Sequence, residues 1–423
     1  MKKLITLLVA AIMSVACCFG LVGCDCGDKP IVGLITLHGE SSTYDKNFID
    51  AFKTACENKG LNEKQYTIVT DVEEGDACYS EAAKLVDNGC KAIFADSFGH
   101  GAYMIKAATE FTDVQFFHAT GTGTSLSTAP ANFHNAFASI YEGRYLAGYA
   151  AGLKLNTMKD KAVDNVFKVG YIGAYTYAEV ISGYTSWFLG LQAALDEGYT
   201  ATMEVQFTGS WYDEAAEKTA AETLITNGAV LVSQHADSMG APTACDNAGV
   251  PNVAYNGTTN KNTLVAYSKI NWVPYFEMVV DCALNGTEVK KDFTGSLADG
   301  SVQYAVGSAA TTETATKLAA VEKDLKDGKI QVFDVSKFTV TVRAVGTNGK
   351  DDFGLNANAT IDENGHLTAY NADVVDDGTY AGDTNVIKTD AATGITYFSE
   401  STFRSAPYFD LTIDGITLLN TKY

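Results

Sequence analysis

The fold of this chain is constrained most by a repeated alternation between short apolar runs and longer segments with helical periodicity. The alternation begins at residue 30, and strands and helices that alternate at this spacing form right-handed βαβ units within a parallel sheet. We therefore expect an α/β fold. The first expected strands are residues 31–36, 66–70, 91–95 and 114–118, and the first expected helices are residues 48–58, 79–88 and 102–111.

A second alternation of the same kind follows a loop at residues 120–132, a long helix at residues 140–153 and a polar stretch at residues 154–164. Two successive α/β halves of similar size indicate two lobes rather than one continuous sheet. We expect the ligand site in the cleft between such lobes. The strands expected in the second half are residues 167–172, 202–207, 229–233 and 253–256, and the helices are residues 179–197, 213–227 and 239–248.

The chain changes character near its C-terminal end. Further elements are expected at residues 264–268, 272–284 and 311–325, but the stretch from residue 332 to residue 423 has no long helical pattern. This stretch is rich in Thr, Asp, Asn and Gly, and its short alternating runs predict a β-rich extension. Its acidic loops lack the DxDxDG pattern of a calcium site, so we interpret them as turns.

The composition of the 423-residue chain excludes several classes of function. With 46% hydrophobic residues, the chain can bury a core in each of two or three domains. Its formal net charge of −21 argues against nucleic acid and anionic lipid surfaces as partners, because both require clustered Lys and Arg. HExxH, GxSxG and P-loop motifs are absent, the six histidines show no metal-ligand spacing, and the scattered cysteines are interpreted as mostly free. We therefore expect no metal, no cofactor and no enzymatic activity.

The N-terminus has the pattern of a targeting segment. Lys2 and Lys3 precede an apolar run at residues 4–16, and the LVGC sequence that ends at Cys24 resembles a bacterial lipoprotein signal. By this resemblance residues 1–23 are the signal peptide, and Cys24 carries the lipid. The mature protein is then expected on the extracytoplasmic face of the cell membrane, anchored by lipid and not crossing it. An ordinary export signal with an incidental cysteine is the alternative.

Aromatic and polar side chains gather where the expected strands end. Because the carboxyl ends of parallel strands lie at one edge of a sheet, we expect these residues close together. Aromatic rings with a few carboxylates and amides suit a flat ligand whose edge forms hydrogen bonds. The residues at these strand ends are Tyr44, Phe48, Ser97, Phe98, Tyr175, Tyr177, Trp211, Tyr212, His235, Asp237 and Ser238.

Several of these segments resemble blocks of the basic membrane protein family, the substrate-binding lipoproteins of ABC importers that take up purine nucleosides or bases. The YDKNF sequence at residues 44–48 is similar to the DDKSF segment of that family. The similarity runs in order from about residue 30 to residue 335. Further similar blocks are ADSFG at 95–99, HATG at 118–121, IYEGRYLAG at 140–148, AEVISG at 178–183, SWYD at 210–213, QHADS at 234–238 and FRSAPYF at 403–409.

The resemblance implies roles for particular residues. Phe48 and Tyr177 fall where the family stacks a purine, with Trp211 as an alternative stacking residue. Asp96 and Ser97 fall where the family reads the edge of the base, and Asp237, Asn256 and Lys269 fall where it holds the rest of the ligand. The segment before Phe48 departs from the family and contains His38 and Glu40. We therefore expect this segment to determine differences in base preference. The candidate ligand-binding residues are His38, Tyr44, Asp45, Phe48, Asp96, Ser97, Phe98, Tyr177, Glu179, Trp211, Asp237, Asn256 and Lys269.

The resemblance also implies a type I periplasmic-binding-protein fold, with two Rossmann-like lobes joined by three crossovers at a hinge. The N-terminal lobe is expected to comprise residues 29–155 and about 256–310. The C-terminal lobe is expected to comprise residues 156–255 and about 311–335, followed by the β-rich extension at 336–423. Residues 339–396 match no part of the family that we recognise.

The expected function is binding of a purine nucleoside or nucleobase and its delivery to an ABC permease with an ATPase subunit. Three alternatives remain open at this point. A sugar-binding protein of the same fold would also use aromatic rings, and a nucleoside-hydrolysing enzyme would need a metal held by carboxylates such as Asp96, Asp213 and Asp237. A sensor domain that feeds a membrane receptor would share the fold.

Overall fold

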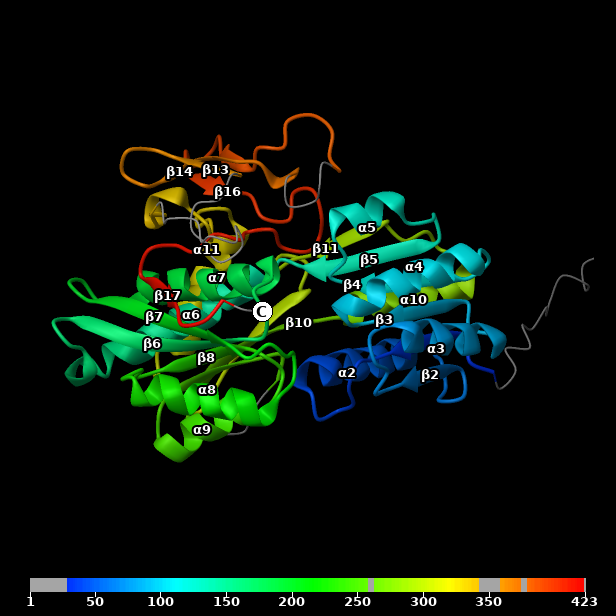
Figure 1. Cartoon of the computed structure of the whole chain (residues 1–423), viewed down its shortest axis with the longest axis horizontal. Helices are drawn as coiled ribbons and strands as arrows, with labels where there is room; N and C mark the ends of the chain where they lie inside the picture. The colour runs from blue at the N-terminus through cyan, green and yellow to red at the C-terminus, as the bar shows by residue number, and fades with distance from the viewer. Residues whose placement is uncertain (1–28, 258–261, 342–357, 374–378, 422–423) are drawn as a thin grey trace, which may run out of the picture.

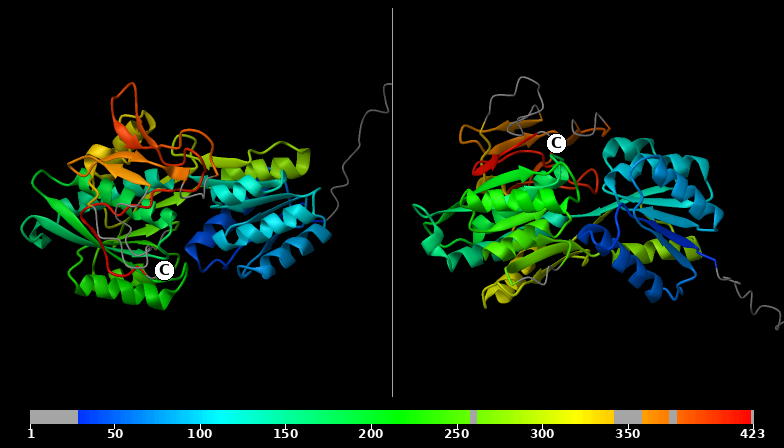
Figure 2. Two further views of the ribbon diagram at one scale, coloured as in Figure 1. Left: turned by 45° about the horizontal axis from the view of Figure 1, so that its top comes forward. Right: turned by 60° about the horizontal axis from the view of Figure 1, so that its bottom comes forward.

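Two α/β lobes and a β-rich extension make up the computed structural model of the protein, which describes residues 29–257, 262–341, 358–373 and 379–421 (Figure 1). Figure 2 shows from two further directions that the extension lies over the second lobe, with the first lobe at its side. The expectation of an α/β fold with parallel sheets and a β-rich C-terminal region is confirmed.

The first lobe is built on a six-stranded sheet in the order β11-β5-β4-β3-β1-β2, in which every neighbouring pair is parallel. Helices α2 and α10 pack against each other and cover one face of the sheet. Helices α3 and α4 form a second packed pair. Strands β1 and β3 are buried along their whole length, as expected for strands covered on both faces. The strands are β1 (Val32–Ile35), β2 (Tyr66–Val69), β3 (Ala92–Ala95), β4 (Gln115–Ala119), β5 (Phe133–Ala138) and β11 (Asp292–Gly295). The helices are α2 (Thr43–Asn58), α3 (Asp76–Asp87), α4 (Gly101–Glu110), α5 (Gly123–Thr128) and α10 (Val273–Asn285).

The second lobe is built on a seven-stranded sheet in the order β12-β10-β9-β8-β6-β7-β17. All neighbouring strands are parallel except β10 and β12, which are antiparallel. The strands are β6 (Val166–Gly173), β7 (Thr200–Phe207), β8 (Val232–His235), β9 (Asn252–Tyr255), β10 (Leu264–Ile270), β12 (Val302–Val306) and β17 (Ile416–Leu418). The helices are α6 (Ile140–Asn156), α7 (Ala178–Ala194), α8 (Glu214–Thr226), α9 (Gly240–Ala248) and α11 (Thr314–Lys326).

The chain passes between the two sheets three times, after β5, after β10 and after β11. The strand pairing differs from the expected lobe boundaries, because β10 and β12 lie in the second sheet although residues 256–310 were expected in the first lobe. Helix α6 also packs on α7 and β10 of the second lobe. Hydrophobic patterns predict that a segment is a strand, but they do not say which sheet it joins. Sequence analysis also missed α5, which lies inside the expected loop at 120–132, and the strands β5, β11 and β12.

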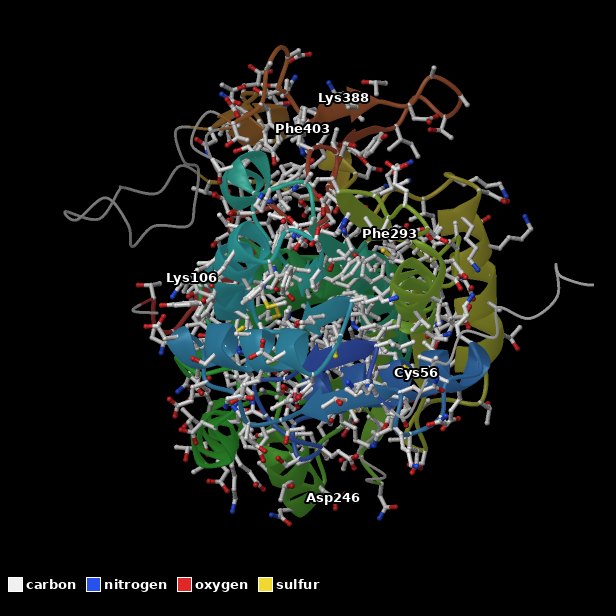
Figure 3. The ribbon with its side chains drawn as sticks, turned by 90° about the vertical axis from the view of Figure 1, so that its right-hand side faces the viewer. Cys56, Lys106, Asp246, Phe293, Lys388 and Phe403 are labelled. Atoms are coloured by element: carbon white, nitrogen blue, oxygen red, sulfur yellow. The ribbon has the colours of Figure 1, made fainter. Side chains whose placement is uncertain are left out.

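The described residues of the extension form two hairpins and a terminal strand. β13 (Ala359–Ile361) pairs with β14 (Leu367–Tyr370), and β15 (Ile387–Thr389) pairs with β16 (Thr396–Phe398), each pair being antiparallel. β17 then joins the edge of the second sheet in parallel with β7. Figure 3 shows Lys388 and Phe403 of the extension at one end of the molecule and Asp246 of α9 at the other.

The segment between β16 and β17 contacts both lobes. The Glu400 carboxylate accepts a hydrogen bond from Ser182 Oγ of α7 at 2.8 Å. The Ser405 backbone N and Oγ both donate to the Asp292 carboxylate of β11 at 2.6 Å. The extension is therefore attached to the second lobe through α7 and β7, and to the first lobe through β11.

The cysteines of the described part of the chain agree with the expectation that most of them are free. Cys56, Cys78, Cys90, Cys245 and Cys282 are free, and burial raises the pKa of the first four thiols to about 12. Among the described residues, no helix combines the length and the apolar character that a membrane span requires. The lipidation site expected within residues 1–28 lies outside the described residues.

Helices α6 and α7 approach one another closely at glycines. A Cβ atom at Gly148 would overlap the carbonyl oxygen of Trp187, and a Cβ atom at Gly190 would overlap the carbonyl oxygen of Tyr145. In both cases the obstacle is backbone, which cannot move aside as a flexible side chain can. The two helices can therefore keep this separation only with glycine at the contact.

We expect Gly148→Ala to lower the free energy of unfolding by about 1–3 kcal/mol, because the added methyl group overpacks the helix contact. Urea denaturation followed by circular dichroism measures the change. Gly39→Ala is the control, since a Cβ atom there would meet nothing closer than Asp71 Oδ2 at 3.7 Å. Equal stability of the two variants would contradict the close contact between α6 and α7.

Candidate ligand-binding cleft

A narrow cavity lies between the two lobes, where the carboxyl ends of both sheets face one another. This is the place where open parallel sheets bind ligands. The first lobe contributes Leu37, His38, Tyr44, Asp45, Ser97, Phe98 and Thr120. The second lobe contributes Glu179, Trp211, His235, Asp237 and Tyr255.

The loop between β1 and α2 is held by the start of the helix. Ser42 is the N-cap of α2, where its hydroxyl accepts a hydrogen bond from the Asp45 backbone N and donates to Asp45 Oδ2 at 2.5 Å. Asp45 Oδ1 accepts a hydrogen bond from the His38 backbone N at 2.7 Å. The hydrogen bond between the side chains of His38 and Asp45 raises the pKa of His38, although burial opposes this shift. Asp45 therefore orders the loop as well as lining the cavity.

Asp96 lies behind the first-lobe wall and is fully buried. Its Oδ1 accepts a hydrogen bond from the Leu37 backbone N at 3.2 Å, and its carbonyl oxygen accepts one from the Tyr44 hydroxyl at 2.9 Å. Burial, together with the negative charge of Asp45, raises the pKa of Asp96 well above its usual range. The next residue, Ser97, does line the cavity and donates its hydroxyl to Glu74 Oε1 at 2.6 Å.

The second-lobe wall carries two further carboxyl groups. Glu179 lies in the first turn of α7, where burial raises its pKa to about 7 and the positive charge of Arg144 opposes the shift. Burial raises the pKa of Asp237 well above its usual range, and the nearby negative charges of Asp45, Glu217 and Glu179 raise it further. His235 Nε2 lies 3.5 Å from Glu179 Oε1.

Aromatic rings border the cavity from both lobes. The rings of Tyr175 and Tyr177 are stacked with their centroids 5.1 Å apart, and Trp211 lies 5.1 Å from Tyr175 and 5.9 Å from Tyr177. Phe98 of the first lobe lies 5.5 Å from Tyr177. A flat ligand can thus be held between rings while carboxylates and hydroxyls meet its polar edge.

The two lobes also touch each other directly across the cleft. The Thr43 backbone N and Oγ1 both donate to the carbonyl oxygen of Asp237, at 3.0 Å and 3.1 Å. The rings of His38 and Tyr212 are 5.4 Å apart. Together with the contact between Phe98 and Tyr177, these interactions show a closed arrangement of the lobes.

The structure brings together eight of the thirteen candidate residues in the cavity wall: His38, Tyr44, Asp45, Ser97, Phe98, Glu179, Trp211 and Asp237. Asp96 lies behind the wall, and Tyr177 stands beside it with 42% of its surface exposed. Asn256 and Lys269 line a neighbouring cavity, which Thr43 and Asn47 also line.

Phe48 is the clearest correction. Its side chain is fully buried in the core of the first lobe, where its ring stacks on Trp272 at 4.4 Å and lies 5.6 Å from Phe94. Phe48 shares a helix face with Ala51, which is also buried, so the side chain that the resemblance places on a purine belongs to the packing face of α2.

Three cavity residues were missed by the sequence analysis: Leu37, Thr120 and Tyr255. His235 was named there as a strand-end residue, but it was not among the thirteen candidate ligand-binding residues. Tyr255 is the last residue of β9 and His235 the last of β8, so both stand at the carboxyl end of a strand. The strand-end rule that selected the other residues would have selected Tyr255 as well. Within the described residues, no three His, Cys, Asp or Glu side chains are grouped so as to hold a metal ion.

Two α/β lobes with a cavity between them are an arrangement that a solved structure shares. The ABC transporter solute-binding protein from Conexibacter woesei superposes with a TM-score of 0.56 at 20% sequence identity, covering 71% of this chain and 98% of that chain. The fold is therefore of the type I periplasmic-binding-protein class, as expected.

The family follows from the sequence comparison. The model of PnrA-like ABC transporter substrate-binding proteins, the Bmp family, matches residues 35–334, and the chain belongs to this family. The expected resemblance is confirmed, and the match ends where the extension begins. A substrate-binding protein of an ABC importer takes a small-molecule ligand outside the cytoplasm and works with a permease and an ATPase.

Two curated relatives are similar over most of the matched region. A purine-binding protein of Brucella abortus is 28% identical over 270 residues, which cover 63% of this chain and 72% of that protein. A putative ABC transporter glucose-binding protein of Haloferax volcanii is 26% identical over 282 residues, which cover 65% of this chain and 66% of that protein.

We expect Phe48→Ala to lower the free energy of unfolding by about 3–5 kcal/mol, because it leaves a cavity in a packed aromatic core. Phe98→Ala is the matched control, since Phe98 is 40% exposed at the cleft and its removal leaves no core cavity. Urea denaturation of both variants measures the difference. Equal stability of the Phe48→Ala and Phe98→Ala variants would contradict the burial of Phe48 in the core of the first lobe.

Proposed function

We propose that the protein is an extracytoplasmic solute-binding lipoprotein that captures a purine nucleoside or nucleobase in the cleft and delivers it to an ABC permease. The observation that carries this proposal is the cavity itself, in which rings from both lobes stand beside carboxyl groups. A fused aromatic base with N–H donors at its edge matches that combination. The similarity to a purine-binding relative supports the same choice.

The carboxyl groups in and behind the cavity wall limit the kinds of ligand that the cleft can bind. Asp45, Glu179 and Asp237 line it, and Asp96 lies directly behind. A phosphate group in this place would meet carboxyl oxygens, and the cavity wall formed by the described residues contains no Lys or Arg side chain to pair with it. We therefore propose a nucleoside or free base rather than a nucleotide.

Sugar binding is the second candidate. Aromatic rings also stack on pyranose faces, carboxylates accept hydrogen bonds from sugar hydroxyls, and one relative is named as a putative glucose-binding protein. Nucleoside hydrolysis is less well supported, because Asp213 does not line the cavity. Its Oδ1 instead accepts a hydrogen bond from the Ala216 backbone N as the cap of α8.

A thermal-shift screen followed by calorimetric titration tests the proposal. Adenosine, inosine, guanosine, adenine and hypoxanthine are compared with glucose and AMP, and a ligand that binds the folded state raises its melting temperature. We expect stabilisation by at least one nucleoside or base, and none by AMP. Stabilisation by glucose alone would establish the sugar-binding alternative.

For the ligand identified in that screen, we expect Trp211→Ala to weaken binding by about 1–3 kcal/mol, because a ring that stacks on a desolvated base is lost. Isothermal titration calorimetry measures the change. Trp211→Phe is the control and is expected to retain most of the affinity, since it keeps an aromatic face. Unchanged affinity of Trp211→Ala would remove this residue from the ligand contact.

The lipid anchor is part of the same proposal, and it rests on the LVGC sequence at the N-terminus. We expect Cys24→Ser to release the protein from membranes, because the lipoprotein signal that the LVGC sequence resembles attaches the lipid to this cysteine. Cys26→Ser, two residues further on, is the matched control and is expected to leave the protein attached. Membrane fractionation with immunoblotting measures both, and retention of Cys24→Ser would exclude the anchor.

A further inference from the structure

Thr120 lies in the cavity wall with an uncommon backbone conformation. It is the first residue after β4, it is 4% exposed, and its φ angle is 65°. A β-branched residue seldom adopts this left-handed conformation, so the surrounding structure must hold it there. Two hydrogen bonds do so. The Thr120 backbone N donates to the Ala136 carbonyl oxygen at 3.2 Å, and the Gly121 backbone N donates to Asn135 Oδ1 at 2.7 Å.

The side chain of Asn135, on β5, is the partner that fixes Gly121. It is fully buried, and a Cβ atom at position 121 would lie 2.7 Å from Asn135 Oδ1, so this close approach requires glycine. Asn135 Nδ2 donates to Asp292 Oδ1 at 2.8 Å and to Ser405 Oγ at 2.9 Å. Both polar atoms of the amide are therefore paired, and only in this orientation, because a flipped amide would turn an N–H group toward the Gly121 N–H.

Ser405 brings the C-terminal extension to this amide. It lies in the connecting segment, residues 399–409, which follows β16. Its Oγ accepts from Asn135 and donates to Asp292 Oδ1 at 2.6 Å, and its backbone N donates to Asp292 Oδ2 at 2.6 Å. Ser405, Asp292 and Asn135 thus form a closed ring of hydrogen bonds, in which each bond helps to fix the other two.

The connecting segment is attached independently of the loop after β4. The Glu400 carboxylate accepts hydrogen bonds from Ser182 Oγ of α7 at 2.8 Å and from the Tyr408 backbone N at 2.6 Å. The Tyr408 hydroxyl donates to the Ser399 carbonyl oxygen at 2.6 Å, which closes the segment on itself. Ser405 is therefore held in place by contacts with the second lobe and by contacts within the segment.

We propose that Ser405 is a positioning residue for the ligand site, which acts through Asn135 to hold the loop after β4 in the conformation that lines the cavity. The contacts run from Ser405 to Asn135, then to Gly121 and Thr120, and of these four residues Thr120 lines the cavity. The extension thereby contributes to ligand affinity without touching the ligand. This inference deepens the proposed function, and what it says about affinity rests on that function.

Removal of the Ser405 hydroxyl leaves one N–H of the Asn135 amide without its acceptor. A buried donor without a partner is costly, so we expect the amide to turn toward another acceptor and to loosen its bond to the Gly121 N–H. Thr120 then loses one of the two hydrogen bonds that hold its left-handed conformation. The binding-competent conformation of the loop becomes less populated, and the apparent affinity falls in proportion.

Hydrogen exchange measured by mass spectrometry tests this positioning in the ligand-free protein. We expect faster exchange in the peptide that covers residues 118–122 in Ser405→Ala, because the Gly121 N–H loses its fixed acceptor. Ser399→Ala is the matched control and is expected to leave this peptide unchanged, since the Ser399 hydroxyl bonds to Thr402 within the connecting segment.

Two results of the exchange experiment would overturn the proposal. One is unchanged exchange of the peptide in Ser405→Ala, and the other is an equal increase throughout the first lobe, which would show general loosening instead of positioning. If Ser405→Ala does not fold, Ser405→Cys is measured in its place, because a thiol occupies a similar position and is a much weaker hydrogen-bonding group.

Calorimetric titration with adenosine, inosine, adenine and hypoxanthine tests the effect on affinity. We expect Ser405→Ala to weaken binding by about threefold or more and Ser399→Ala to leave it unchanged. In an Asn135→Ala background, Ser405→Ala is expected to cause no further loss of affinity, because Ser405 acts through Asn135. Additive losses would contradict this route. Absence of binding to all four purines would reject the proposed function, and the exchange result would still decide the positioning.

Discussion

Parallel strands place their carboxyl ends at one edge of a sheet, and in this protein two such edges face each other. Everything in the cleft depends on this constraint. The residues that follow β1, β3 and β4 meet those that follow β6, β7, β8 and β9, although they are far apart in the chain. Loops at these positions can vary without disturbing the buried strands, because the sheets are fixed by apolar residues on both faces. The ligand site is therefore formed by short loops at the strand ends. The hydrophobic pattern determines the two sheets that carry these loops.

Bringing two such edges together concentrates carboxyl groups. Asp45, Asp96, Glu179 and Asp237 stand in or directly behind one cavity, and burial raises the pKa of Asp96, Glu179 and Asp237. The two lobes stabilise their buried carboxyl groups in different ways. On the first lobe, Asp45 accepts hydrogen bonds from the Ser42 hydroxyl and from the His38 backbone N, whereas on the second lobe the positive charge of Arg144 opposes the effect of burial on Glu179. The two walls of the cleft are thus electrostatically different.

Much of this architecture was predictable from periodicity, and the failures have identifiable physical causes. The alternating pattern predicted most strands and helices of both lobes, since each depends on local spacing of apolar residues. The sheet membership of β10 and β12 depends on pairing between distant segments, which local spacing does not contain. Phe48 was assigned to the ligand by resemblance although its helical spacing already indicated the core. The contact between Arg144 and Tyr255 needed the structure, because it joins α6 to the end of β9.

The extension changes what closure of the lobes requires. In a two-lobed binding protein the lobes rotate about the crossovers, and contacts such as Thr43 with Asp237 form or break during that motion. Here the segment between β16 and β17 is a further connection, since Glu400 is bonded to α7 and Ser405 to Asp292 of β11. Asn135 donates to Asp292 and to Ser405 and accepts from the Gly121 backbone N, one residue beyond Thr120 of the cavity wall. Any rotation of the lobes must therefore either preserve this hydrogen-bonded connection or exchange it for water, and in both cases the extension takes part in the energetics of closure.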